Sequence, residues 1–232
     1  MYGDAGIGLV AGAVILLVAL RFAEKLDRET WCCVAVSVMM MAVGDALWAR
    51  NGVLFHVAGV GVSLAELLYA VAYAIFAIAL FRYAFKSRAH VDVAWVAVET
   101  LVTTALIGAT LWVTFLAPTT RAIGGIDSAI SADLSYVFFD FPLLFAPVLA
   151  VLLVMIRLGD QRLAYPWFAV AAGVLILIAA EVGWFWERAH GGVYPGSLAG
   201  FGFMAANMLL LAGAMTALEM QPIAAVVTVE GD

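Results

Sequence analysis

Five carboxylates stand inside long apolar stretches of this sequence, where an ionised group is costly. A carboxylate at the centre of a membrane-spanning helix costs about 2.5–3.5 kcal/mol on the insertion scale, so an acid in such a place calls for a reason. At 1.5 Å per residue, four of them are expected to share one layer, roughly 6–9 Å inside the same end of four helices. The five are Asp45, Glu66, Asp140 and Glu181, which form that layer, and Glu99, which is expected in the opposite half of its helix.

Polar aromatic residues accompany these acids at helical spacing. Three of the aromatic residues follow an acid by three positions and one follows by seven, so each shares a helix face with its acid. Carboxylates offer charge and aromatic rings offer a cation–π face, which suits a cation or an amine. Protons are an equal candidate, because carboxyl groups that lie close together titrate as a coupled set. We therefore predict an outward-facing pocket with Asp45, Glu66, Asp140 and Glu181 as its acids and Trp48, Tyr69, Tyr73 and Trp184 as its walls.

The same residues also fit a purely structural role. Each acid could hydrogen-bond to a polar side chain on a neighbouring helix and fix the bundle without binding anything. A metal joining His56 and His190 to the acids is a weaker alternative, so the metal is left unassigned. No HExxH or GxSxG motif occurs, and we do not expect an enzyme. No cofactor is predicted: both lysines, Lys25 and Lys86, fall outside the middle of the helices, which argues against a retinal Schiff base.

The elements that must position these residues follow from composition. Hydrophobic residues make up 66% of the 232 positions and charged residues 12%, whereas soluble domains have about 45–50% and 25%. A bilayer is the solvent that such a chain requires. We predict an all-α, polytopic bundle of seven transmembrane helices over residues 1–218, followed by a short cytoplasmic tail, 219–232. The seven apolar stretches are 7–23, 31–49, 60–83, 91–116, 134–158, 165–186 and 198–218, and the longest loop is expected at 117–133.

Basic residues predict the orientation of this bundle. One set of loops and helix ends holds eight Lys and Arg residues and the opposite set holds three, Arg50, Arg121 and Arg188. Cytoplasmic loops carry the excess of basic residues, which places the N-terminus outside and the C-terminus inside. The net charge of −6 leaves no basic surface for phosphates, so nucleic acid is not an expected partner. The pair Gly8 and Gly12 has the spacing of a close helix–helix contact.

Several of these residues together resemble a known kind of domain. The stretches Gly44-Asp-Ala-Leu-Trp48, Ala65-Glu-Leu-Leu-Tyr69 and Ala72-Tyr73, with Asp140 near Pro142 and Glu181 near Trp184, resemble seven- or eight-helix sensor-like membrane domains. Such domains precede GGDEF/EAL or histidine-kinase modules in bacterial and archaeal signalling proteins. Glu66 stands where that resemblance leads us to expect Asp, and residues 219–232 are too few to form an output module. The resemblance therefore implies a separate cytoplasmic signalling partner, a longer form of the chain, or a diverged function.

Taken together, these features favour a sensor-like or receptor-like module of the inner (plasma) membrane. An outward-facing pocket would bind a small ligand, cation or proton, and a change in helix packing would reach a cytoplasmic partner. The alternatives are a small proton- or cation-coupled transporter and a membrane enzyme acting on lipid. Besides the lipid bilayer and that partner, a homo-oligomer is left open.

Overall fold

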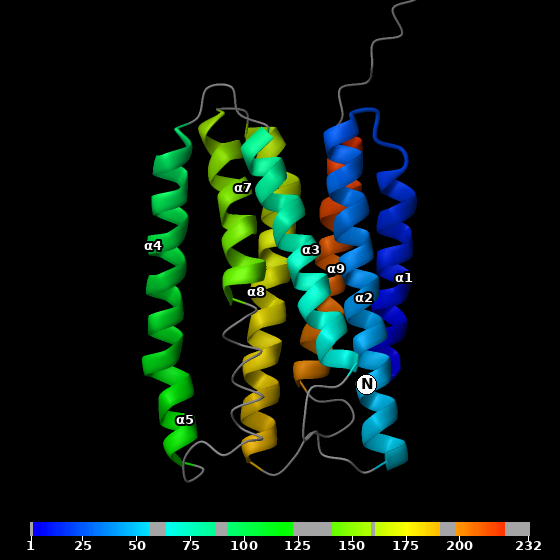
Figure 1. Ribbon diagram of the computed structural model, residues 1–232, viewed down its shortest axis with the longest axis vertical. Helices are drawn as coiled ribbons and strands as arrows, with labels where there is room; N and C mark the ends of the chain where they lie inside the picture. The colour runs from blue at the N-terminus through cyan, green and yellow to red at the C-terminus, as the bar shows by residue number, and fades with distance from the viewer. Residues whose placement is uncertain are drawn as a thin grey trace, which may run out of the picture.

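The chain folds into a bundle of long helices, seen here in a computed structural model that describes residues 2–55, 64–86, 92–122, 141–158, 161–190 and 198–220. Every element within these ranges is helical, as the sequence predicts (Figure 1). The helices are α1 (Tyr2–Ala19), α2 (Lys25–Phe55), α3 (Leu64–Lys86), α4 (Val93–Leu111), α5 (Ala117–Ala122), α7 (Ala146–Arg157), α8 (Gln161–Ala189) and α9 (Leu198–Glu219), with π-helical segments at Trp112–Leu116 and Phe141–Phe145.

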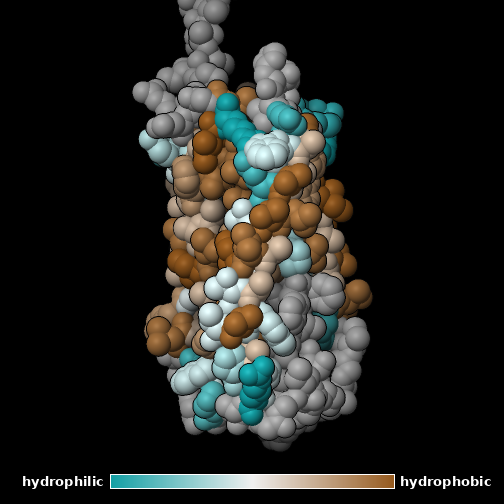
Figure 2. Space-filling model, turned by 90° about the vertical axis from the view of Figure 1, so that its left-hand side faces the viewer, coloured by the Kyte–Doolittle hydropathy of each residue, from teal (hydrophilic) through white to brown (hydrophobic). Residues whose placement is uncertain are grey.

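The outer surface of the bundle is suited to lipid. Within the described residues, five helical stretches are long and apolar enough to cross a membrane, and two apolar helices, Ala5–Ala19 and Phe141–Arg157, are shorter. Large apolar side chains project from α4 and the π segment that follows it: Leu101 and Leu106 of α4 are 70% and 64% exposed, and Val113 of the π segment is 68% exposed. On the face that carries α4, apolar residues form a broad band and hydrophilic residues lie toward the two ends (Figure 2). The chain is thus a polytopic α-helical membrane protein.

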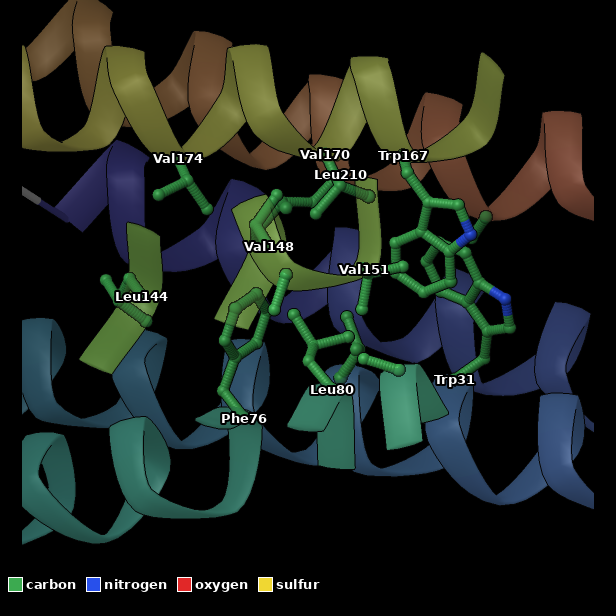
Figure 3. Close-up of a cluster of buried hydrophobic side chains, with 14 of the residues drawn as sticks. Trp31, Phe76, Leu80, Leu144, Val148, Val151, Trp167, Val170, Val174 and Leu210 are labelled. Atoms are coloured by element: carbon green, nitrogen blue, oxygen red, sulfur yellow. The ribbon is translucent and has the colours of Figure 1, made fainter. Parts of the chain in front are cut away.

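Among the described helices, six close a ring, and α4 with its continuation α5 lies outside it. In turn around the ring, α1 packs against α2, α2 against α3, α3 against α7, α7 against α8, α8 against α9, and α9 against α1. The core that they enclose holds Phe76 and Leu80 of α3, Val148 and Val151 of α7, and Leu210 of α9 (Figure 3). Helix α4 lies at the edge of the bundle against α7 (Figure 1).

Small residues bring neighbouring helices close together. A Cβ atom on Gly12 would lie 3.1 Å from the Ala35 carbonyl oxygen, and one on Gly8 would lie 2.8 Å from the Ala42 Cβ. This confirms the predicted use of Gly8 and Gly12 in helix packing. Helices α8 and α9 approach in the same way at Gly202, where an added Cβ would meet the Ala180 Cβ at 2.7 Å.

Both π-helical segments precede an Ala-Pro pair. The fourth residue before Pro118 is Thr114, and the fourth before Pro147 is Leu143; each is the third residue of its π segment. A proline ring clashes with the carbonyl of the fourth preceding residue and cannot donate a hydrogen bond to it. A wider π turn relieves both problems, and the Ala117 N–H accordingly bonds to the Trp112 carbonyl five residues back.

The expected loop at 117–133 was therefore wrong at its start. The helical column of α4 continues through Ala122, because the π turn accommodates Pro118 and because the next two hydroxyls are satisfied within the helix. Thr119 donates to the Phe115 carbonyl at 2.8 Å and Thr120 to the Ala117 carbonyl at 2.9 Å. The rest of the expected loop lies outside the described residues.

Helix α2 is longer than the predicted stretch 31–49, since it runs from Lys25 to Phe55. Its first turns are charged, so the apolar pattern of the sequence did not include them in the helix. Ion pairs stabilise these turns. Glu29 pairs with Lys25 within the helix and with Arg82 of α3. Helix α1, expected to reach residue 23, ends at Ala19, and Phe22 turns back to stack on Trp31 at 6.3 Å.

Candidate functional site

One predicted acid is bonded to one predicted aromatic residue across two helices. The Tyr69 hydroxyl of α3 donates to the Asp45 Oδ1 of α2 at 2.5 Å. Gly44 makes the approach feasible, because a Cβ there would lie 2.9 Å from the Tyr69 ring. A charge-assisted bond of this kind is short and strong, and it satisfies part of a carboxylate that lipid cannot solvate.

Two more pairs extend this arrangement. The indoles of Trp48 on α2 and Trp184 on α8 meet edge to face, with ring centroids 5.4 Å apart and planes at 78°. The ring of Tyr73, one turn further along α3, stacks on Tyr69 at 6.4 Å. We call these five residues, Asp45, Trp48, Tyr69, Tyr73 and Trp184, the acid–aromatic layer. They connect α2, α3 and α8 near the end of the bundle where α3 begins and α8 ends (Figure 1).

The other predicted acids are placed less completely. Glu66 lies in the first turn of α3, and Glu181 lies on α8, three residues before Trp184; both are half-buried and both interact with neighbours. Asp140 lies outside the described residues. A single pocket shared by all four acids therefore stays a prediction, while the acid–aromatic layer is an observed part of it.

Glu99, expected apart from the other acids, has a partner of its own. Its Oε2 lies 2.6 Å from the Arg157 Nη2, which joins α4 to the end of α7. This ion pair explains why a carboxylate is tolerated on an otherwise apolar helix: both charges are about two-thirds buried and neutralise each other. Glu99 thus holds α4 against the bundle.

The opposite end of the bundle carries a second acid–aromatic arrangement that sequence reasoning missed. The Tyr83 side chain of α3 lies close enough to the Asp27 carboxylate of α2 to interact with it. Its ring packs against the Trp167 indole of α8, with ring centroids 4.9 Å apart. Trp31 of α2 stacks on Trp167 at 5.2 Å and on Phe22 at 6.3 Å. We call these five residues, Phe22, Asp27, Trp31, Tyr83 and Trp167, the basic-end cluster, because exposed Arg21, Lys25, Arg28 and Lys86 surround it in the sequence.

The two ends use the same residue types on the same three helices. In each, an Asp of α2 lies beside a Tyr of α3, and a Trp of α2 packs against a Trp of α8. Figure 3 shows Trp31 and Trp167 facing each other at one end of the buried apolar cluster. The signal that could have revealed the second set was an acid followed by Trp four residues later, but its acid fell outside the expected span.

A metal centre finds little support in the part of the chain that the structure describes. No group of three or more His, Cys, Asp or Glu side chains is assembled there to hold an ion. His190 stacks on Trp186, with ring centroids 4.5 Å apart, and its Nδ1 lies 2.9 Å from the Trp186 carbonyl oxygen. His56, the other residue considered for a metal, lies outside the described residues.

Comparisons with known proteins identify no relative. No family model, no curated protein and no solved structure matches this chain. The resemblance to sensor-like membrane domains therefore rests on the short motifs of the sequence, and the function has to be argued from the acid–aromatic layer.

Proposed function

We propose that this chain is a sensor-like membrane module that binds a cation or an organic amine at the acid–aromatic layer. The observation that carries the proposal is the Asp45–Tyr69 hydrogen bond on α2 and α3, with the Trp48–Trp184 pair joining α2 to α8 one turn away. A carboxylate beside aromatic rings on three helices offers charge and cation–π contact together. A cation held there would contact three helices at once.

The orientation proposed for the module is N-terminus outside, C-terminus inside, with seven spans. Arg21, Lys25, Arg28 and Lys86 are all exposed, and they lie where α1 ends, α2 begins and α3 ends. Those termini gather at one end of the bundle (Figure 1). Because basic residues are retained in the cytoplasm, this end would be cytoplasmic and the acid–aromatic layer would face outward.

Signalling would follow from competition for Asp45. A bound cation and the Tyr69 hydroxyl would compete for the Asp45 carboxylate. Binding would therefore favour a helix arrangement in which the Asp45–Tyr69 hydrogen bond is altered. A separate cytoplasmic signalling protein would read the altered arrangement. The input domains that the sequence resembles work in front of such output modules, which supports a receptor over a scaffold.

The test measures thermal unfolding of the detergent-solubilised protein with tetramethylammonium chloride, against sodium chloride at equal ionic strength. Binding to the folded state raises the melting temperature by linkage, so tetramethylammonium should stabilise the protein and sodium should not. Asp45→Asn and Glu66→Gln should each remove the gain. Asp92→Asn is the matched control: Asp92 caps α4 through the Trp95 N–H, and Asn caps a helix equally well. Equal gains in Asp45→Asn and in the unmodified protein would refute the site.

A proton- or cation-coupled carrier is the second candidate. The observation that favours it is the second acid–tyrosine pair, Asp27 and Tyr83, at the opposite end of the same helices, since a carrier must offer its cargo a site from each side. Proteoliposomes containing the protein should then take up radiolabelled tetramethylammonium, and Asp45→Asn should abolish uptake. Stabilisation without uptake would favour the sensor.

A further inference from the structure

We infer that α2 and α3 form a two-ended coupling that transmits the state of the Asp45–Tyr69 bond to the opposite end, where Tyr83 lies beside Asp27 and Arg82 pairs with Glu29. The trigger rests on the proposed function, because cation binding would act on Asp45. The mechanical connection rests on the helices alone, so the two can fail separately.

The two acid–tyrosine pairs are in register along both helices. Asp27 and Asp45 are 18 residues apart, which is five turns at 3.6 residues per turn, so they lie on one face of α2. Tyr69 and Tyr83 are 14 residues apart, close to four turns, so they lie on one face of α3. The two acid–tyrosine pairs therefore lie along one side of the contact between the two helices.

Both helices are continuous and therefore stiff. Helix α2 runs unbroken from Lys25 to Phe55 and α3 from Leu64 to Lys86, and neither contains proline. The sharp kinks that would absorb a displacement arise mainly at proline and at π turns, which the described residues place beside α4 and α7 and, at Pro166, within α8. A rotation or slide of α3 at Tyr69 is therefore carried along the helix to Tyr83.

The far end of α3 is tied to the protein surface. The Tyr83 ring packs against Trp167 of α8 at 4.9 Å, and the neighbouring residue Arg82 pairs with Glu29 on the first turns of α2. Glu29 in turn interacts electrostatically with the ammonium groups of Lys25 and Lys86. A displacement at Tyr83 thus changes how these two exposed ammonium groups are arranged, at the surface where a cytoplasmic protein would dock.

Lys25 and Lys86 are the two lysines of the chain, one on each helix, and they provide a built-in probe. The experiment measures the yield of the Lys25–Lys86 cross-link with bis-succinimidyl esters of graded length, by mass spectrometry, without added cation. Tyr69→Phe removes the hydroxyl of the first bond and should change the yield by about twofold or more at one linker length, as expected when a packing equilibrium shifts. Tyr83→Phe should change it as well. Tyr165→Phe, an exposed tyrosine of α8, is the control and should leave the yield unaltered.

Each outcome decides the point. Should Tyr69→Phe match the unmodified protein while Tyr83→Phe differs, the ends are uncoupled and the inference is overturned, even if tetramethylammonium still stabilises the protein. Should Tyr83→Phe itself leave the cross-link yield unchanged, the Tyr83 hydroxyl does not influence how Lys25 and Lys86 are arranged, and the inference is again overturned. A changed yield in Tyr69→Phe without stabilisation by tetramethylammonium would refute the proposed function and keep the coupling. If Tyr69→Phe does not fold, Asp45→Asn takes its place, and the same change in the Lys25–Lys86 cross-link yield is expected.

Discussion

Gly44 determines how closely the Tyr69 ring can lie against α2. Its missing side chain leaves the space that the ring occupies, and the hydroxyl thereby reaches the Asp45 carboxylate on the adjacent residue. Even a methyl group at position 44 would overlap the Tyr69 ring. The ring cannot easily move aside, because its hydroxyl is hydrogen-bonded to Asp45. At the scale of single residues, the acid–aromatic layer thus depends on the lack of a Cβ atom at Gly44.

The corresponding prediction is that Gly44→Ala destabilises the protein by about 1–3 kcal/mol through overpacking and displaces the Tyr69 hydroxyl. Gly183→Ala, next to Trp184, is the matched control, because an added Cβ there has its nearest neighbour at 4.0 Å. Alanine is about 1 kcal/mol better than glycine within a helix, so Gly183→Ala should be neutral or stabilising. Thermal unfolding in detergent measures both changes. Equal melting temperatures for the two variants would show that Tyr69 moves away at no cost.

At the scale of elements, α4 is the helix with the least support from the bundle. Its buried residues are Val96 and Thr100, and most of its large apolar side chains are exposed. Near its start it is held by the Glu99–Arg157 ion pair, and near its end by contacts of Leu111, Trp112 and Phe115 with a small cluster that includes Phe185 of α8. The ion pair is therefore one of several contacts that hold α4, alongside the burial of Val96 in the main core.

We expect Arg157→Gln to loosen α4 selectively. Amide hydrogen exchange over residues 93–111 should become faster, while exchange in α8 and α9 stays unchanged, because low local stability shows as local opening. The global cost should be about 1 kcal/mol or less, since both groups are partly solvated. Arg121→Gln, at the far end of the same helical column, should not speed exchange. The double variant Glu99→Arg with Arg157→Glu should restore protection; a failure to do so would mean that charge pairing is not what holds α4.

At the scale of the whole molecule, the distribution of charge predicts how the bundle sits in the membrane. A cytoplasm-active reporter fused after Asp232 should be functional and an export-active reporter there should be silent, because basic residues gather at the end where α9 finishes. Moving three arginines to the loops at the other end is the control and should weaken or reverse the result. An active exported fusion on the unmodified chain would invert the orientation and place the acid–aromatic layer inside.

The sequence alone was enough to determine the helical, membrane-spanning character of the chain. A backbone in lipid must satisfy its own hydrogen bonds, so long apolar stretches become helices wherever their neighbours lie. The same local logic placed Glu66, Tyr69 and Tyr73 on one face of α3, because spacing along a helix fixes direction. It failed at the start of α2, where charged residues continue the helix through the ion pairs of Glu29.

Tertiary structure decided which of those faces meet. Nothing in the spacing of α2 or α3 required Asp45 to face Tyr69, since that depends on how far the two helices slide past each other and on the room left by Gly44. The spacing of residues within single helices also did not predict the contact between Trp48 and Trp184, which lie 136 positions apart in the chain. Periodicity constrains each helix about its own axis, whereas register between helices arises from packing, to which every residue of both surfaces contributes.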